Sequence, residues 1–128
     1  MKQSIRHQMS RLRRALLDLK ESPGRLLPLF LDDLPLMKGT VYPLRRRCGK
    51  PGCRCAKTGE LHESLVLTAS VEGRTRLRTL SPEEIERTRE LTRRYQRVRA
   101  ARAEFVKLYG RMVKIIDRLE NLRRVDPR

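Results

Sequence analysis

The run Cys48-Gly-Lys-Pro-Gly-Cys-Arg-Cys55 decides how the middle of this 128-residue chain folds, because it places three thiols within eight residues. His62 follows after six intervening residues. Three thiolates and one imidazole match the tetrahedral, four-coordinate preference of structural zinc. The glycines and the proline permit a tight turn that folds the first sulfur back towards the second. The sequence therefore predicts a Zn2+ ion held by Cys48, Cys53, Cys55 and His62.

The type of this predicted metal site bears on activity. Four protein ligands close a zinc site and leave no position for an activated water, which favours a structural ion over a catalytic one. Neither Ser64 nor Ser81 has the His and Asp companions of a catalytic set, so we expect no enzymatic activity. The alternatives are free cysteines, since the spacing matches none of the commonest zinc-finger formulas, and a redox switch. His7 is interpreted as an ordinary surface residue.

Cations crowd around the predicted metal turn. The chain has a formal net charge of +16, and the segment 38–80 is its most basic part. Such an excess is typical of a protein whose partner is a polyanion, because bound phosphates release their counterions. The alternative is a solubilising surface. The candidate nucleic-acid-binding residues are Arg45, Arg46, Arg47, Lys50, Arg54, Lys57, Arg74, Arg76 and Arg78.

Short strands are expected on both sides of the metal turn. The segment Thr40 to Leu44 suits an edge strand, where Pro43 is tolerated because one side of an edge needs no ladder donor. Apolar residues alternate over 65–71, and Glu72-Gly73 is typical of a turn. Arginine then alternates with Thr75, Leu77 and Thr79, which predicts a hairpin with one cationic face inside a zinc-binding β module over 39–80.

Helices are expected at both ends of the chain. An amphipathic helix is predicted over 1–22, ended by Pro23 and Gly24, because its apolar residues recur every three or four positions. Ser81 as cap, Pro82 at the first helical position and Glu84 at the capping-box position predict the start of a long helix over 81–125. The apolar positions of the first helix are Ile5, Met9, Leu12, Leu16 and Leu19.

The long helix carries a coiled-coil-like apolar rhythm that Arg102 interrupts. The predicted seam consists of Leu91, Tyr95, Val98, Phe105, Tyr109, Met112, Ile116 and Leu119. A flanking stripe with a seven-residue repeat consists of Ala101, Leu108, Ile115 and Leu122. A face this wide is expected to pack against the first helix, and its remainder to form a homodimer or to bind a larger protein partner.

These elements predict an α+β fold, in which a small zinc-stabilised, three-stranded module lies between an N-terminal helix and a long C-terminal helix. An apolar connector over 23–38 is expected to be a helical turn or an extended strip that joins the core; a docking patch for a partner protein is the alternative. It is too short and too interrupted to span a bilayer, so no membrane association is expected. Without an apolar signal core, the chain is expected in the cytoplasm, where association with the nucleoid would be consistent with its charge.

Composition also bears on which nucleic acid would bind. Five aromatic residues and no tryptophan argue against a platform for stacking single-stranded bases. A duplex is therefore favoured, and DNA is preferred over structured RNA. The rival hypothesis is an accessory subunit that docks through its helical face onto a larger nucleic-acid-processing protein or a ribonucleoprotein.

The stretch from Lys38 to about Tyr95 resembles a group of small prokaryotic proteins of unknown function. Their shared pattern is a strand with glycine and an aromatic residue, a basic run, a Cys-Gly-Lys-Pro-x-Cys-x-Cys turn, a Gly-x-x-His element, a hairpin and a long basic helix. After the histidine they have Gly-Pro-Tyr, whereas this chain has Glu63, Ser64 and Leu65. Such proteins accompany mobile elements and transposases, so the resemblance implies a nucleic-acid role. The matching positions here are Gly39, Tyr42, Arg45 to Arg47, Cys48 to Cys55, Gly59 and His62.

Overall fold

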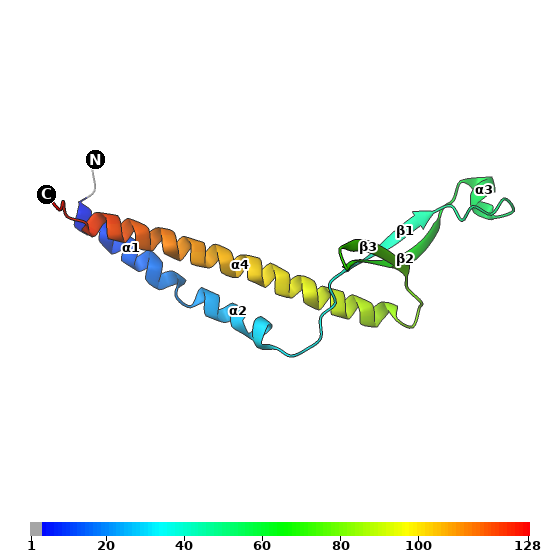
Figure 1. Cartoon of the computed structure of the whole chain (residues 1–128), viewed down its shortest axis with the longest axis horizontal. Coiled ribbons are helices and arrows are strands. Elements are labelled where there is room, and N and C mark those ends of the chain that lie inside the picture. Colours follow the sequence, from blue (N-terminus) through cyan, green and yellow to red (C-terminus); the bar gives the residue numbers. More distant parts are fainter. Residues whose placement is uncertain (1–3) are drawn as a thin grey trace. The chain divides into compact units, whose positions relative to one another are not determined.

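The computed structural model describes residues 4–128 and has the predicted α+β architecture (Figure 1). Two compact units divide the chain, one made of residues 1–33 and 98–128 and the other of residues 34–97. The long helix α4 contributes residues to both. The elements in chain order are α1 (Ile5–Leu19), α2 (Ser22–Leu31), β1 (Thr40–Arg46), α3 (Arg54–Thr58), β2 (His62–Val71), β3 (Arg74–Thr79) and α4 (Ile85–Arg123).

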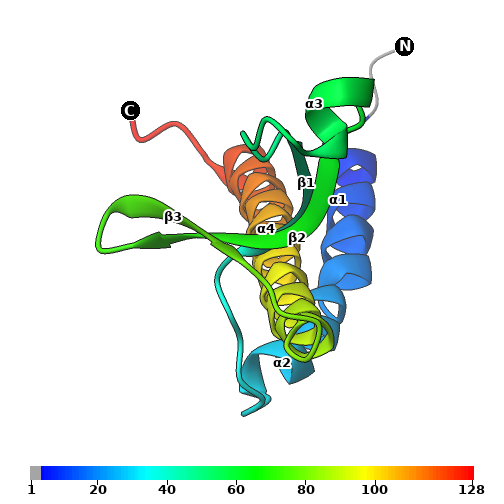
Figure 2. The same ribbon diagram turned by 90° about the vertical axis from the view of Figure 1, so that its right-hand side faces the viewer.

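The unit 34–97 is built on a three-stranded antiparallel sheet with the strand order β1-β2-β3 (Figure 2). β1 is an edge strand, as predicted, and it runs two residues further than expected, to Arg46. Glu72 and Gly73 connect β2 to β3 with φ angles of 54° and 79°. Positive φ at both central residues is what a two-residue type I′ hairpin turn requires. Glycine adopts this conformation freely, whereas Glu72 adopts it at a steric cost.

A small core holds this sheet to the first turns of α4. Val66 is fully buried, and Leu67 and Leu80 are 9% and 6% exposed. Thr88 and Thr92 of α4 are buried as well, and the Thr92 hydroxyl donates to the Arg89 carbonyl at 3.1 Å. This hydrogen bond satisfies a polar group that would otherwise be costly to bury.

The segment between α2 and β1 is extended and lies against α4. The Met37 N–H donates to the Leu91 carbonyl at 3.1 Å, and the Arg94 guanidinium donates to the Pro35 carbonyl at 2.7 Å. Arg94 also forms an ion pair with Glu90 at 2.8 Å. These contacts fix the position of the chain just before β1 begins at Thr40.

The start of α4 differs in detail from the prediction. The helix begins at Ile85 rather than at Pro82, because the Glu84 N–H donates to the Ser81 carbonyl and closes a tight turn at 3.1 Å. Half of the expected capping box is present, since the Ser81 N–H donates to the Glu84 carboxylate at 2.8 Å.

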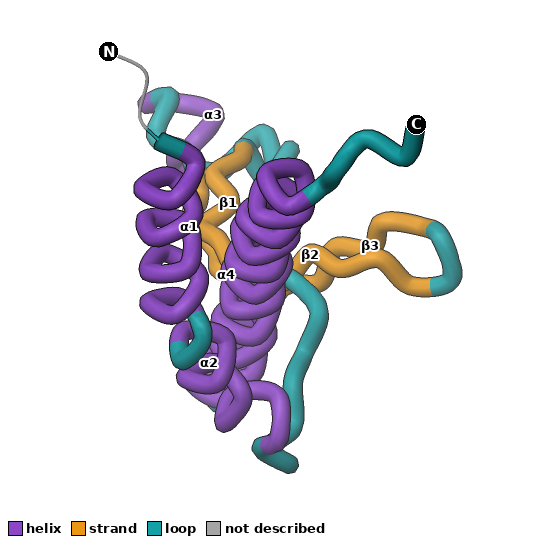
Figure 3. The backbone as a smooth tube through the Cα atoms, turned by 90° about the vertical axis from the view of Figure 1, so that its left-hand side faces the viewer, coloured by secondary structure: helices purple, strands orange, loops and turns teal. Residues whose placement is uncertain are grey.

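The unit 1–33 with 98–128 packs α1 and α2 along the C-terminal part of α4 (Figure 3). Leu12 of α1 is buried, as are Ala101 and Leu108 of α4. The rings of Phe30 and Phe105 meet edge to face with their centroids 5.7 Å apart. Aromatic pairs in this geometry add to the gain from burial alone.

The buried stripe of α4 agrees with most of the predicted seam but not with all of it. Beyond Val98 it combines the predicted flanking stripe with Phe105, Met112 and Leu119 of the predicted seam. Tyr109 and Ile116 are 47% and 49% exposed, and Arg102 is exposed too, so it interrupts nothing. Because the apolar face of α4 is wide, the sequence is compatible with burial of either of two neighbouring rows of residues. Packing against α1 and α2 determines which row is buried. The covered positions are Ala101, Phe105, Leu108, Met112, Ile115, Leu119 and Leu122.

The N-terminal elements also refine the prediction. α1 ends at Leu19, and Pro23 and Gly24 lie at the start of a second helix, α2, because proline is compatible with a first helical turn. The predicted connector 23–38 is thus largely helical, with an extended tail. The Ser4 side chain caps α1 by accepting from the His7 N–H at 3.2 Å. Among residues 4–128, no helix combines the length and the apolar character needed to cross a membrane.

Candidate metal centre and basic surface

The four predicted metal ligands meet at the end of the sheet where β1 finishes and β2 begins. Figure 1 shows the short helix α3 at this end of the two strands. The ligand atoms of Cys48, Cys53, Cys55 and His62 all lie within 4.8 Å of one another. Cys48 follows β1 by two residues, and His62 is the first residue of β2. The pairing of Arg46 with His62 brings the two strand ends together.

The loop between the strands folds back through residues suited to tight turns. Gly49 has a φ of 80°, and the Cys53 N–H donates to the Lys50 carbonyl at 3.1 Å. α3, a short helix that the sequence did not predict, then carries Cys55 and ends at Gly59. Gly59 has a φ of 76° and its N–H donates to the Cys55 carbonyl, a left-handed cap for which glycine is the favoured residue.

The separation of two sulfurs fits a tetrahedral ion, since Cys48 Sγ lies 3.6 Å from Cys55 Sγ. Cys53 Sγ lies closer to His62 Nε2, at a hydrogen-bond distance of 3.0 Å. Two thiolates bound at about 2.3 Å to one tetrahedral zinc ion are about 3.8 Å apart. All three cysteines are free thiols. The donor set and its spacing therefore suit a metal ion with thiolate and imidazole ligands.

The thiols of the cluster differ in acidity. Hydrogen bonding to the Cys55 backbone, and then to the His62 and Cys48 side chains, lowers the pKa of Cys53 from 9.0 to about 6. The pKa of Cys48 is raised: a hydrogen bond with the Lys50 backbone lowers it, but hydrogen bonds with Cys53 and Cys55 and partial desolvation raise it by more. Cys55 is only 2% exposed. The cluster therefore offers one thiolate near neutral pH, and thiolates are the form that binds metal.

The predicted basic residues divide between the two faces of the sheet. The register places Arg74, Arg76 and Arg78 opposite Val71, Ala69 and Leu67, and Arg45 opposite Glu63. Side chains alternate along a strand, so all four arginines project from one face of the sheet. We call Arg45, Arg74, Arg76 and Arg78 the arginine face.

The opposite face of the sheet carries Val66 and is turned towards α4. Thr68 and Thr75 of this face line a shallow hollow together with Tyr95 of α4. Arg46 projects from this face, beside His62, rather than with Arg45. The predicted triplet of arginines is therefore not one patch. Exposed cations around the metal turn are Arg47, Lys50, Arg54 and Lys57.

Two acidic partners were missed by the sequence reasoning. The Arg45 guanidinium donates to the Glu63 carboxylate at 3.1 Å, and that of Arg78 donates to Glu84 at 2.7 Å. Arg74 and Arg76 form no ion pair within residues 4–128. Cross-strand pairing follows from the register of the sheet, which residue spacing alone does not reveal.

Comparison with known proteins places the chain in a family but not in a function. The family described as domain of unknown function, DUF6788, matches residues 7–90. This range includes most of α1, all of α2, the sheet and the whole Cys/His cluster. No curated protein and no solved structure matches the chain.

Proposed function

This chain belongs to the DUF6788 family, a domain of unknown function, and from its own residues we propose that it is a non-enzymatic, zinc-binding protein that holds nucleic acid. Duplex DNA is the preferred ligand over structured RNA. In this proposal the Cys/His cluster binds zinc and fixes the basic loop, while the arginine face contacts phosphates. The single observation that supports it most is that four arginines project from one face of the sheet.

The metal assignment rests on ligand chemistry. Three thiolates with one imidazole are soft and borderline ligands, and in tetrahedral geometry they suit zinc better than calcium or magnesium, which prefer oxygen. With four protein ligands the ion is structural. It would anchor the loop that carries Lys50 and Arg54 to the ends of β1 and β2.

The arginine face is suited to phosphate because part of it lacks acidic partners. Arg74 and Arg76 form no ion pair within the described part of the chain, and every residue of β3 is exposed. Alternate residues of a strand project about 6.8 Å apart, so the guanidinium groups form a regular row. Guanidinium groups bind phosphate oxygens through paired hydrogen bonds, which positions a protein without reading sequence.

The shape of the β2–β3 hairpin favours a duplex. A two-stranded β-ribbon fits the major groove of B-form DNA. No residue of the arginine face or of its neighbours on β2 is aromatic, so base stacking has no platform there. Tyr42 projects from the opposite face of the sheet, the face of Val66.

The test is a binding titration with matched charge reversals. The double variant R74E/R76E should bind a generic DNA duplex about tenfold or more weakly, and its logarithmic salt dependence should become shallower by about two. The control R6E/R13E makes the same change of net charge on exposed residues of α1. An equal loss of affinity in both variants would refute the arginine face as the binding surface, and a wild-type protein that binds neither duplex DNA nor structured RNA would refute the function.

One observation favours the accessory-subunit hypothesis. Leu27, Leu29 and Leu31 of α2 are 43%, 42% and 78% exposed. A protein partner that covers α2 would account for them, and the arginine face would then contact nucleic acid already held by that partner. Under this hypothesis the isolated chain binds duplex DNA weakly at every salt concentration.

A further inference from the structure

The C-terminal part of α4 exposes a second apolar stripe beside the one that α1 and α2 cover. Val106, Tyr109, Val113 and Ile116 are 57%, 47%, 51% and 49% exposed. They recur at intervals of three, four and three residues, the spacing at which one helix packs on another. Single exposed apolar side chains are ordinary, but four in a continuous row mark a contact surface.

Gly110 lies at one edge of this stripe, level with its middle along the helix axis. Glycine weakens the interior of a helix, and this position is in the interior of α4. In the described part of the chain, nothing outside its own helical turn lies within 4 Å of where its Cβ would be, so no packing contact there requires a glycine. A residue without a side chain lets the backbone of another helix approach closely.

Opposite charges lie at the two ends of the stripe. Arg102 precedes Val106 by one helical turn, and Glu120 follows Ile116 by one turn. The pattern is therefore symmetric about the level of Arg111: a cation and two apolar residues on one side, two apolar residues and an anion on the other. This is the arrangement that an isologous contact between identical helices needs, because each half must complement the other.

We propose that the stripe binds the same stripe of a second copy of the chain, with the two α4 helices antiparallel and Gly110 close to the twofold axis. Val106 then lies opposite Ile116 of the second copy, and Tyr109 opposite Val113. Arg102 lies opposite Glu120 at both ends of the contact. A parallel arrangement would instead set Arg102 against Arg102 and Glu120 against Glu120, which like-charge repulsion disfavours.

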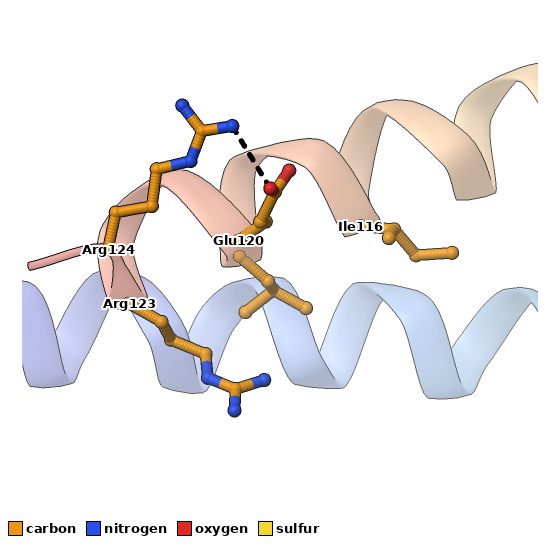
Figure 4. A pocket seen from close by; sticks show the side chains of 5 residues that line it. Ile116, Glu120, Arg123 and Arg124 are labelled. Carbon is orange, nitrogen blue, oxygen red and sulfur yellow. Dashed lines mark hydrogen bonds and ion pairs between the residues drawn. The ribbon is translucent and has the colours of Figure 1, made fainter.

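The end of α4 has room for the charged contact. Ile116, Leu119, Glu120, Arg123 and Arg124 line a hollow, shown in Figure 4. Among residues 4–128 the Glu120 carboxylate accepts only from the neighbouring Arg124, at 3.0 Å and with both side chains more than half exposed. Such an exposed pair is weak, so Glu120 can also accept from a second copy's Arg102. About one turn beyond Arg102, Arg99 of one copy would face Arg123 of the second copy. Repulsion between these like charges would limit the length of the contact.

Sedimentation of the 128-residue chain, freed of nucleic acid, tests the proposal. At about 0.15 M salt we expect a mass of twice 15.1 kDa. V113K should weaken self-association about tenfold or more, since a charge would be buried at the centre of the contact. The control V125K changes an 86%-exposed valine outside the stripe and should leave the dimer intact.

A charge swap tests the antiparallel orientation. R102E and E120R should each weaken the dimer, and the double variant R102E/E120R should restore it, with circular dichroism showing that all variants keep their helix content. A monomeric wild-type chain, a dimer that V113K leaves unchanged, or a swap that fails to restore association would each overturn the proposal. A dimer sensitive to V113K and rescued by the swap would establish it, whatever the protein does with nucleic acid.

Discussion

The residues of the candidate metal centre were predictable at the level of single residues. Cysteine and histidine spacing identifies the four groups whose ligand atoms gather within 4.8 Å. The side chain that neighbours or pairs with each arginine could not be predicted from spacing in the same way. Arg46 lies on the face of His62, and Arg45 pairs with Glu63, because the register of β1 against β2 assigns those neighbours.

Substituting a ligand should release the metal. C53A and H62A each remove one of four donors, so we expect purified protein to lose most of its zinc, because three ligands hold the ion far less tightly. Elemental analysis of metal per chain provides the measurement. H7A, a change at the only other histidine, is the control and should retain the metal of the wild type. Full zinc content in both ligand variants would contradict the assignment.

Glu84 should make the start of α4 sensitive to acid. A hydrogen bond from the Ser81 backbone, and then one from Arg78, lower the pKa of Glu84 below 4.5. A group whose pKa is lowered on folding contributes stability above its unfolded pKa, and this contribution disappears as the pH falls through the folded value. E84Q should therefore have a lower Tm than the wild type at pH 7, and the gap should narrow as the pH falls below about 4.3, the ordinary pKa of a glutamate.

The control for this effect is E83Q, which makes the same change of charge at the neighbouring position. Glu83 is exposed and forms no ion pair in residues 4–128. Thermal unfolding followed by circular dichroism compares the three proteins. A gap between wild type and E84Q that persists unchanged in acid would show that Glu84 does not stabilise the folded chain through its charge.

For the helices and strands, sequence patterns predicted the kind of element better than the residues at which it begins and ends. The strands, the hairpin turn and the long helix are confirmed, because alternation and turn residues are local signals. α3 was not predicted, since five residues are too few for a periodic pattern. The register of the α4 seam was wrong at Tyr109 and Ile116, because a wide apolar face is consistent with more than one packing.

The turn between β2 and β3 can be improved. Glu72 has a φ of 54°, a left-handed conformation that asparagine adopts more readily than glutamate. E72N should raise the free energy of unfolding by about 1 kcal/mol or less. Urea unfolding of the metal-bound protein measures this change. G73A should act in the opposite direction, since Gly73 has a φ of 79°; a loss of stability in E72N would show that the Glu72 side chain has a role beyond the turn.

At the scale of the whole molecule, the division into two units determines how the protein responds to metal removal. The Cys/His cluster belongs to the unit 34–97, whereas α1, α2 and the C-terminal part of α4 belong to the other unit. A structural ion contributes to the stability of the unit that holds it. Loss of zinc should therefore act unequally on the chain.

Chelation should unfold the sheet and leave most of the helices folded. Hydrogen exchange with a strong chelator present should become fast over residues 40–80 and stay slow around Leu108, a buried residue of the other unit. Readdition of zinc should restore protection of the sheet. Uniform loss of protection over both units would mean that they fold as one, and unchanged protection of β2 would mean that the sheet needs no ion.

The two edges of the sheet have a consequence for aggregation. An exposed edge strand offers unpaired N–H and carbonyl groups onto which another chain can add a strand. On β1, Pro43 lacks an N–H and the basic residues Arg45 and Arg46 follow it; on β3, alternate residues are arginine. A strand of an identical chain approaching either edge meets a missing donor or its own charge. Strand addition between identical chains is thereby discouraged, which should keep a concentrated solution of this protein free of β-rich fibrils.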